Sequence, residues 1–343
     1  MISRIFILTL LLISITVNLS STENLNLIIV AMDGSGDFVS VQEALNSIPE
    51  KTTERVVILV KNGIYNEKIF IEKSNIALVG EDKELTKIIY AELRRNWREN
   101  NPDDYGSSVI NIKNDVTDIL FSSLTIYNNY GSIYDDHDHA FAIRAGEGVT
   151  RVIIDDCKII SDGGDTVSLW NTDDGMYYHS NCYFEGWVDY VCPRGYCYIE
   201  NSDFYGHNLT ASIWHDGSHN EDHKFVLRNC RFDGVKGFPL GRFHRDAQFF
   251  LIDCSFTSNM ADQKIFFAPS NPPRILQWGK SRQYYFNCRI DSTKFSWFED
   301  NLSNAPGSPE SEMVDALWTF NNNWNPEREL ELFYQSLNEL ELK

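Results

Sequence analysis

The sequence predicts an all-β fold, a β-solenoid, and its internal repeats are the main reason. Seven segments share one plan: an alternating apolar strand, a short polar step of the Asn-Cys type, and a second short apolar piece. Aligned at that step, they lie 20 to 34 residues apart. Few segments show the helical period that a fold of alternating strands and helices would need. A strand-rich unit at this spacing indicates stacked coils, and the segments are 118–128, 151–161, 176–186, 196–206, 224–234, 248–258 and 283–292.

The cysteines follow the same repeat. Five of the seven occupy the polar step, where Ser123 and Ser202 align with them. We expect these five to stack as small buried thiols, with disulfides or metal ligation as the alternatives; they are Cys157, Cys182, Cys230, Cys254 and Cys288. Cys192 and Cys197 lie off this ladder, and the sequence leaves open whether they pair.

Both ends of the solenoid have helical signals. In GDFVSVQEALNSIPE, Ser40 is a good N-cap for a short amphipathic helix that ends before Pro49. Such a helix would close the open end of the solenoid. Near the C-terminus, residues 308–318 and 326–341 are expected to be helices or tail segments, the second an amphipathic helix packed on the outside.

Residues 1–21 have the pattern of a secretory signal peptide: Arg4, a short apolar run and small polar residues. A buried N-terminal strand is the alternative. We therefore expect one domain over residues 22–343, a secreted or periplasmic location, and no membrane insertion. A net charge of −19 excludes a nucleic-acid partner. It still allows an anionic polysaccharide, because a local cluster of arginines can override the overall sign.

Spacing also brings charged residues together. His139 precedes Asp165 by 26 residues, Asp165 precedes Asp189 by 24, and Arg242 follows Asp189 by 53. These intervals are close to one, one and two coils. Residues one coil apart lie about 4.8 Å from each other across a parallel ladder. The four side chains are therefore expected to converge on one face, although the two acids could instead be turn residues that bind backbone groups.

Two neighbouring carboxyl groups cannot easily both ionise, so one pKa rises and the other falls. The protonated acid can then donate a proton, while the ionised one, held by an arginine, acts as a nucleophile.

The motifs resemble those of the pectin methylesterases. GDFVSVQEALNSIP and VILVKNGIYNEKIFI resemble the opening of that family, and HAFAIR, GGDTV, EGWVDYV and LGR resemble its four active-site motifs in order. TFNNNWNPE resembles its C-terminal segment. The resemblance implies a right-handed parallel β-helix, removal of methyl esters from polygalacturonate, and no metal or organic cofactor. A pectin-like glycan is the implied partner of a chain that we expect to be a monomer.

The resemblance also implies residue roles. Asp189 would attack the ester carbonyl, and Asp165 would protonate the departing methanol and later activate water. Arg242 would hold Asp189 ionised.

Two family glutamines that stabilise the oxyanion are replaced here by His139 and Gly164. Losing one such donor costs about 2.7–4 kcal/mol. His139 can donate from its ring, whereas Gly164 offers only its backbone N–H. His244 stands where the family has an aromatic residue, and Val191-Cys192-Pro193 replaces Ile-Phe-Gly. These changes in the cleft suggest a modified ester substrate.

Further residues are candidates for substrate contact. Trp170, Trp187 and Trp214 are expected to be sugar-stacking platforms, with ordinary packing as the alternative. The segment 135–139, DDHDH, is interpreted as a solvated acidic loop, a substrate-contacting loop or, less well, a metal site, since adjacent strand residues point to opposite faces. Two other functions stay open: a β-helix enzyme that cleaves glycosidic bonds, and a glycan-binding protein without catalysis.

Overall fold

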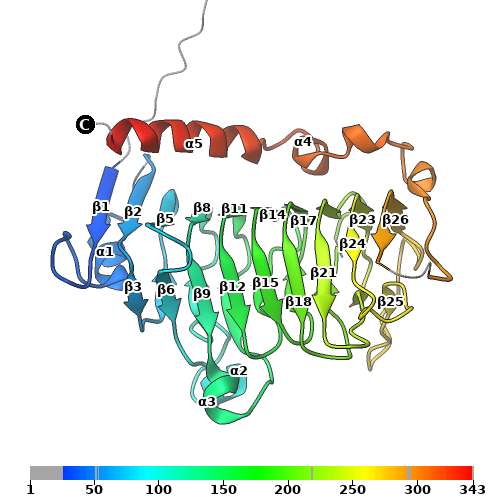
Figure 1. Cartoon of the computed structure of the whole chain (residues 1–343), viewed down its shortest axis with the longest axis horizontal. Helices are drawn as coiled ribbons and strands as arrows, with labels where there is room; N and C mark the ends of the chain where they lie inside the picture. The colour runs from blue at the N-terminus through cyan, green and yellow to red at the C-terminus, as the bar shows by residue number, and fades with distance from the viewer. Residues whose placement is uncertain (1–25, 51, 53, 218, 292–294, 342–343) are drawn as a thin grey trace, which may run out of the picture.

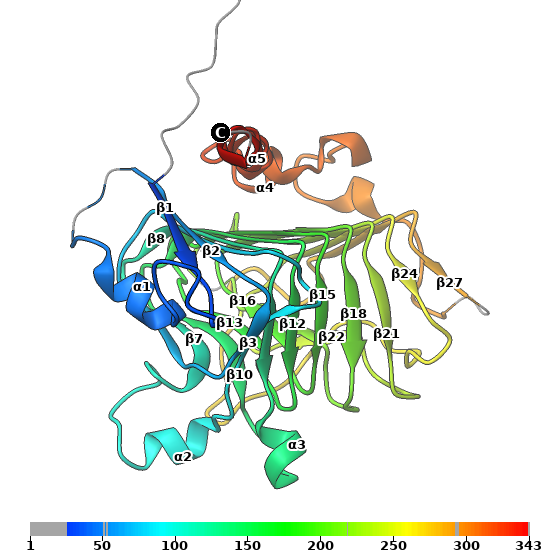
Figure 2. The same ribbon diagram turned by 60° about the vertical axis from the view of Figure 1, so that its left-hand side comes forward.

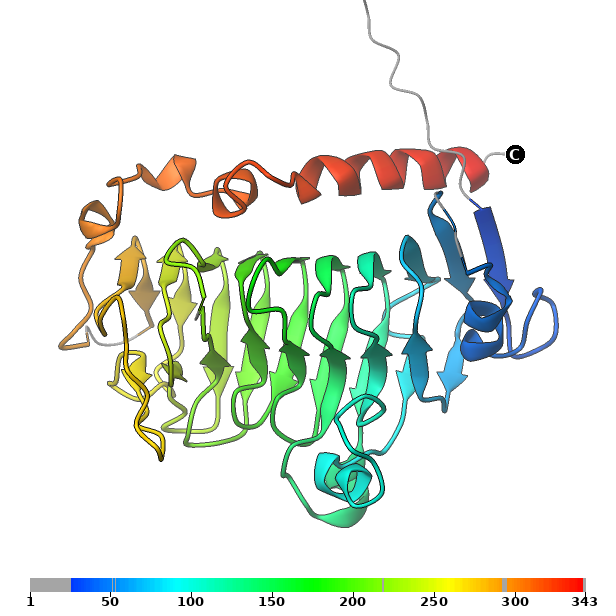
Figure 3. The same cartoon turned by 180° about the vertical axis from the view of Figure 1, so that it is seen from behind.

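The computed structural model describes residues 26–50, 52, 54–217, 219–291 and 295–341. Successive coils of the chain each contribute strands to three long parallel sheets. Figure 1 shows the coils stacked along the long axis, and Figure 3 shows the stack from behind. The expected signal peptide lies outside the described residues. Within them, no helix has both the length and the apolar character that crossing a membrane would require.

The strands belong to three sheets, here called A, B and C. Sheet A contains β1 (Asn26–Val30), β2 (Val56–Val60), β5 (Ile76–Gly80), β8 (Thr117–Ser122), β11 (Thr150–Asp155), β14 (Met176–Ser180), β17 (Tyr196–Glu200), β20 (Phe225–Arg228), β23 (Phe249–Ile252) and β26 (Gln283–Phe286). Sheet B contains β3 (Gly63–Tyr65), β6 (Thr86–Ile89), β9 (Thr125–Asn128), β12 (Lys158–Ser161), β15 (Tyr183–Gly186), β18 (Asp203–Gly206), β21 (Arg231–Gly234), β24 (Ser255–Phe256) and β27 (Arg289–Ile290). Sheet C contains β4 (Ile69–Ile71), β7 (Ser108–Ile112), β10 (Phe141–Ala145), β13 (Val167–Leu169), β16 (Val191–Pro193), β19 (Ile213–Trp214), β22 (Gly241–Phe243) and β25 (Phe266–Phe267).

The inside of the coils is apolar because alternate residues of each strand point inward. In sheet B, Phe184, Phe204, Phe232 and Phe256 occupy one register position and stack with ring centroids 5.2, 4.4 and 5.4 Å apart. All four are buried. Such in-register stacking lets each coil cover the apolar face of the next.

The polar step of the repeat is a left-handed turn between sheets A and B. Asp156, Asn181, Asn201, Asn229, Asp253 and Asn287 all have φ between 48° and 56°, a region that short polar side chains tolerate. The residue after each turns inward: it is Ser202 after Asn201 and one of the five predicted ladder cysteines elsewhere. All five are free thiols, four of them buried and Cys288 partly buried against the core.

One position of the predicted ladder is wrong. Ser123 was aligned with Cys157, but Ser123 is itself the left-handed residue of the turn, with a φ of 53°. The pairing of Thr125 with Lys158 sets Leu124, not Ser123, beside Cys157. The alignment is one residue off because this coil has Ser123-Leu124 at the step, with neither the Asn or Asp nor the small Cys or Ser of the other coils. Cys192 and Cys197 are both free and buried, so the pairing left open by the sequence does not occur in this structure.

The predicted N-terminal helix is confirmed as α1 (Val41–Ser47), with the Ser40 side chain accepting a hydrogen bond from the N–H of Glu43. Its buried residues Val41, Ala44 and Leu45 join the interior core. Figure 2 shows α1 across the N-terminal end of the coils.

The C-terminal segment covers the outer face of sheet A, as Figures 1 and 2 show. It contains two 3-10 turns (Leu302–Asn304 and Ser311–Met313), α4 (Ala316–Thr319) and α5 (Pro326–Glu341). A second apolar cluster, including Val57, Leu120 and Phe250 of the sheet and Phe320 and Phe333 of the tail, fills this interface. Strands of sheet A are therefore apolar on both faces.

Two short helices, α2 (Arg94–Arg98) and α3 (Tyr130–Tyr134), project beside the first coils. Both lie in loops on the way into sheet C, whose outer surface holds the candidate site.

Candidate active site

Asp165 and Asp189 lie two residues before the neighbouring strands β13 and β16. The pairing of Val167 with Val191 gives the two acids the same 24-residue offset, so they are one coil apart. Both are left-handed, with φ of 57° and 52°, and their N–H groups donate to the carbonyls of the next coil, at Val188 and Ala211. The backbone thus fixes both carboxylates at the edge of sheet C.

Asp189 is held by Arg242 from two coils further on. Arg242 Nε donates to Oδ1 at 3.0 Å and Nη2 to Oδ2 at 2.7 Å, a two-pronged pair. The Asp189 side chain is 10% exposed and that of Arg242 21%. Buried, charge-assisted pairs of this geometry are the strong ones. Register brings Arg242 there, because Arg242 pairs with Trp214 and the adjacent Ile213 pairs with Val191.

The protonation of Asp189 reflects opposing effects. Desolvation and the charge of Asp165 raise the pKa of Asp189 to about 6, although the hydrogen bonds of Arg242 act in the opposite direction. The sequence suggested that Arg242 would hold this carboxyl ionised. Burial outweighs the arginine, so this expectation is wrong: the pKa of Asp189 is raised, not lowered, and the carboxyl is half ionised at about pH 6.

His139 lies beside Asp165 and is oriented by Asp138. Its Nδ1 lies 2.7 Å from Asp138 Oδ1, and its Nε2 lies 4.0 Å from Asp165 Oδ1. A carboxylate only accepts, so Nδ1 carries the proton of that bond. Nε2 can therefore donate only when the ring is an imidazolium.

Gly164 has no room for a side chain and no free donor. A Cβ there would lie 2.8 Å from Val188 Cγ1. Its N–H already donates to the carbonyl of Asp138 at 3.2 Å. The suggestion that this N–H serves an oxyanion therefore finds no support in the structure.

The acidic segment 135–139 is divided among separate partners. Arg95 pairs with Asp136 and Asp138, while His137 bonds the carbonyl of Asp162 and stacks on Trp187. In the part of the chain that the structure describes, no three such side chains are grouped as a metal would need.

The three predicted tryptophan platforms differ in exposure. Trp170 is 37% exposed, whereas Trp214 is 6% exposed. The Arg194 guanidinium lies between them, 3.6 Å from the Trp170 ring centre and 3.9 Å from that of Trp214. Arg144 also lies over the Trp170 ring, 4.6 Å from its centre. Both indoles therefore pack against arginines, and Trp170 is the more exposed of the two.

Trp187 lies two residues before Asp189, and His244 lies two residues after Arg242. Trp187 is stacked between His137 and His207, with centroids 3.9 and 5.8 Å away, and its backbone N–H donates to the carbonyl of Gly163. His244 directs Nδ1 to the carbonyl of Ala268 at 2.8 Å.

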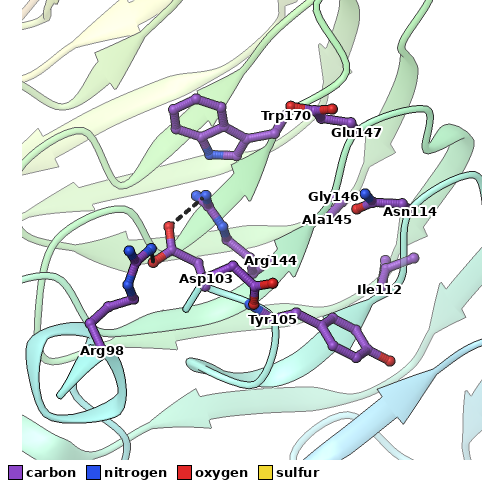
Figure 4. A pocket seen from close by; sticks show the side chains of 11 residues that line it. Arg98, Asp103, Tyr105, Ile112, Asn114, Arg144, Ala145, Gly146, Glu147 and Trp170 are labelled. Carbon is purple, nitrogen blue, oxygen red and sulfur yellow. Dashed lines mark hydrogen bonds and ion pairs between the residues drawn. The ribbon is translucent and has the colours of Figure 1, made fainter. Parts of the chain in front are cut away.

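Trp170 separates two hollows on the surface of sheet C. The first, of about 280 Å³, is drawn in Figure 4, with Trp170 and Glu147 at one edge and Tyr105 at the other. Arg144 lies between them and pairs with Asp104 at 2.9 Å. The second, of about 170 Å³, also has Trp170 in its wall, together with Trp214 and His244. Together they form an extended surface suited to a chain-like ligand.

The sequence reasoning missed several residues of this surface: Asp138 as the partner of His139, and Arg194, Asp216, Arg245 and Arg274 around the second hollow. Only Arg194 could have been found from the sequence. It is two residues from Cys192, so strand alternation puts the two side chains on the same face of the sheet. The others depend on loop geometry.

Known proteins resemble this chain in both sequence and fold. The sequence pattern of the Pectinesterase family matches residues 27–237, a range that ends before Arg242. Pectinesterase/pectinesterase inhibitor U1 of Solanum lycopersicum is 26% identical, over 63% of this chain and 37% of its own length. Putative pectinesterase 11 of Arabidopsis thaliana is 28% identical, over 74% and 66%. The chain thus spans between about a third and two thirds of these relatives.

The solved structure of pectin methylesterase PemA from Erwinia chrysanthemi has a TM-score of 0.69 and 20% identity, covering 90% of this chain and 99% of that one. This likeness and the three parallel sheets confirm the predicted right-handed parallel β-helix. The family pattern covers more than half of the sequence, including both acids, and the chain belongs to the pectinesterase family.

Proposed function

We propose that this protein hydrolyses methyl esters of galacturonate in pectin or a related uronate-containing glycan, with Asp189 as nucleophile. One observation carries the proposal: a buried carboxylate bound by the Arg242 fork lies one coil from a second carboxylate, Asp165, on the exposed face of sheet C. A structural turn residue would need neither the fork nor the neighbouring acid. Membership of the pectinesterase family supports this reading.

In the first step, an oxygen of ionised Asp189 attacks the ester carbonyl carbon. The carbonyl electrons move to oxygen, and the tetrahedral intermediate collapses as the bond to the methoxy group breaks. Asp165 gives its proton to that oxygen, so methanol leaves and an acyl-enzyme anhydride remains.

In the second step, the now ionised Asp165 takes a proton from water, whose oxygen attacks the acyl carbon. The bond to Asp189 breaks, which releases the uronate and restores the Asp189 carboxylate. Arg242 binds that carboxylate before and after the reaction, so its position is fixed throughout.

The oxyanion is assigned to His139 in the imidazolium form. Asp138 holds Nδ1, and the free Nε2 side faces the acids from beside Asp165. A charged donor is roughly twice as strong as a neutral one, so His139 offsets part of the loss of two glutamines.

The glycan would lie along the outside of sheet C. The exposed part of Trp170, between Arg144 and Arg194, would contact it, and Trp187 and His244 would bound the reacting unit. The chemistry needs no metal or organic cofactor. We further propose that residues 1–21 direct export and that the protein acts as a monomer outside the cytoplasm.

The deciding experiment measures two products from methyl-esterified pectin: methanol, and new reducing or unsaturated chain ends. We expect methanol alone, lost in Asp189→Asn and Asp165→Asn and kept in Arg328→Gln, a surface control on α5. Chain ends without methanol would show a glycan-cleaving enzyme. Neither product, with glycan still bound, would show a binding protein.

A further inference from the structure

The first turn of α2 contacts the segment that carries His139. Arg94 donates its backbone N–H to the carbonyl of His139 at 2.9 Å. The next residue, Arg95, directs its guanidinium to the carboxylates of Asp136 and Asp138, and its Nη1 lies 3.3 Å from Asp138 Oδ2. Two consecutive residues of α2 therefore hold the backbone of His139 and the side chain to which its ring is bonded.

The position of α2 is itself fixed on the sheet. Leu93, directly before the helix, is fully buried. The Asp104 carboxylate pairs with Arg94 of the helix at 2.8 Å and with Arg144 of β10 at 2.9 Å. Figure 2 shows the helix beside the first coils. A group on its first turn therefore has a defined place relative to β10, and His139 lies two residues before that strand.

Asp138 divides its two oxygens between His139 and Arg95. Oδ1 accepts the backbone N–H of His139 at 2.8 Å and lies 2.7 Å from the ring Nδ1, whereas Oδ2 faces Arg95. Burial acts to raise the pKa of Asp138, but the hydrogen bonds from His139 outweigh it and the charge of Arg95 adds to them, so this pKa is lowered. The carboxylate is therefore ionised at neutral pH, and an imidazolium at His139 would share its charge with Arg95.

The stability of the fold does not explain the contact with Arg95. The Arg95 side chain is 58% exposed and that of Asp138 is 43% exposed, and ion pairs this open to water contribute little to folding. The backbone of Asp138 is also held by other groups, because its N–H donates to Asp136 Oδ1 and its carbonyl accepts the N–H of Gly164, both at 3.2 Å. What Arg95 adds is the orientation of the carboxylate and a positive charge beside it.

The charged groups around the His139 ring come from its own segment, from the next two coils and from α2. They are Asp138, Asp165 with its Oδ1 4.0 Å from Nε2, Asp189 with its partner Arg242, and Arg95 with its second partner Asp136. The carboxylates favour the imidazolium form of the ring, and the arginines oppose it. Arg95 is the cation that opposes it on the Nδ1 side.

We propose that Arg95 is a positioning residue for the reaction: it orients Asp138, and through Asp138 the oxyanion donor His139, while it offsets part of the Asp138 charge. This inference rests on the proposed function, in which His139 must be an imidazolium. Without Arg95 the ring would be less well aimed but would keep its proton to higher pH. The two effects can be separated, because aim changes the maximal rate and charge changes the pH at which the rate is lost.

The first measurement does not depend on turnover. Nuclear magnetic resonance of protein with labelled histidines gives the titration midpoint of the His139 ring, whose signal is assigned by its absence in His139→Gln. In Arg95→Gln this midpoint should move up by roughly half a pH unit, the effect of one partly screened charge. Arg95→Lys keeps the charge and should leave the midpoint in place. Arg231→Gln removes an arginine of similar exposure from an ion pair on sheet B and is the matched control, with no shift expected.

The second measurement is methanol release from methyl-esterified pectin over the same pH range. Arg95→Gln should lower kcat about fivefold at unchanged KM, the effect of one weakened hydrogen bond in the transition state, and its alkaline limb should move up with the ring. Arg95→Lys lacks the planar fork that meets two carboxylates, so it should recover only part of the rate and keep the original limb. An unchanged urea midpoint would verify that the variants fold.

A midpoint that stays in place in Arg95→Gln, or that moves equally in Arg95→Lys, would overturn the inference. A fall in rate with no movement of the alkaline limb would overturn it too. A moved midpoint without methanol from any ester would refute the proposed reaction and leave the coupling of Arg95 to His139 standing. Methanol release with an unmoved midpoint and an unchanged kcat would do the reverse.

Discussion

The pairing of Arg242 with Asp189 should control how the reaction rate depends on pH. The nucleophile must be ionised, so activity is present above its pKa and is lost as the pH falls through it. With the pKa of Asp189 raised to about 6, methanol release by the unaltered protein should fall off below about pH 6.

The Arg242→Gln variant removes the charged donors and keeps the carboxyl buried. The fork contributes charge-assisted hydrogen bonds worth about 1.5–3 kcal/mol, and one pKa unit corresponds to about 1.36 kcal/mol. The pKa of Asp189 should therefore rise by roughly one to two units, and the acid limb should move to roughly pH 7–8. Arg242→Lys keeps a charge without the fork, so its limb should lie between the two.

The assay is the initial rate of methanol release between about pH 4 and pH 9, with blanks that lack enzyme. A rate that recovers toward high pH in Arg242→Gln would show that the arginine acts through the ionisation of Asp189. An acid limb that does not move would refute this reasoning. Arg328→Gln should keep the original profile.

Three further outcomes follow from the contacts. Asp138→Asn should lower kcat/KM about tenfold, because His139 loses its orientation. Adding Asp138→Asn to the His139→Gln variant should lower kcat/KM almost no further. Gly164→Gln should fail to raise activity, and a urea titration should show that it destabilises the fold by about 1–3 kcal/mol, because the new side chain overpacks against Val188. If adding Val188→Ala to this variant raises the rate, the missing space, and not the amide, is what limits it. Phe333→Ala on α5 should cost about 3–5 kcal/mol of unfolding free energy, and no change in the urea midpoint would show that the tail is not part of the folded unit.

The fold could be predicted from sequence because its signals are local. Alternation gives each strand its two faces, and the left-handed step places Asn or Asp before each inward cysteine. The Ser40 cap is a three-residue pattern. The error at Ser123 arose where a coil lacked its cysteine, because only pairing across coils sets the register there.

The candidate site could be predicted only in part. In a solenoid, sequence spacing becomes distance, so Asp165, Asp189 and Arg242 were found from intervals near one and two coils. Spacing cannot say whether a side chain is covered, and so Trp214 was expected as a sugar platform although it is buried beneath Arg194. Burial of Asp189, which sets its pKa, also depends on neighbouring coils.

The replaced glutamines have a structural consequence that sequence comparison alone would not give. At Gly164 the lost side chain has left no vacancy, because Val188 occupies the space and Asp138 takes the N–H. At His139 the new side chain has a carboxylate partner, Asp138, that a neutral amide would not need. Under the proposed mechanism, two neutral donors are exchanged for one charged donor. Two donors together stabilise the transition state by about 5–8 kcal/mol, which is more than one charged hydrogen bond supplies. We therefore expect the protein to hydrolyse ordinary methyl esters slowly, and to do so only while His139 is protonated.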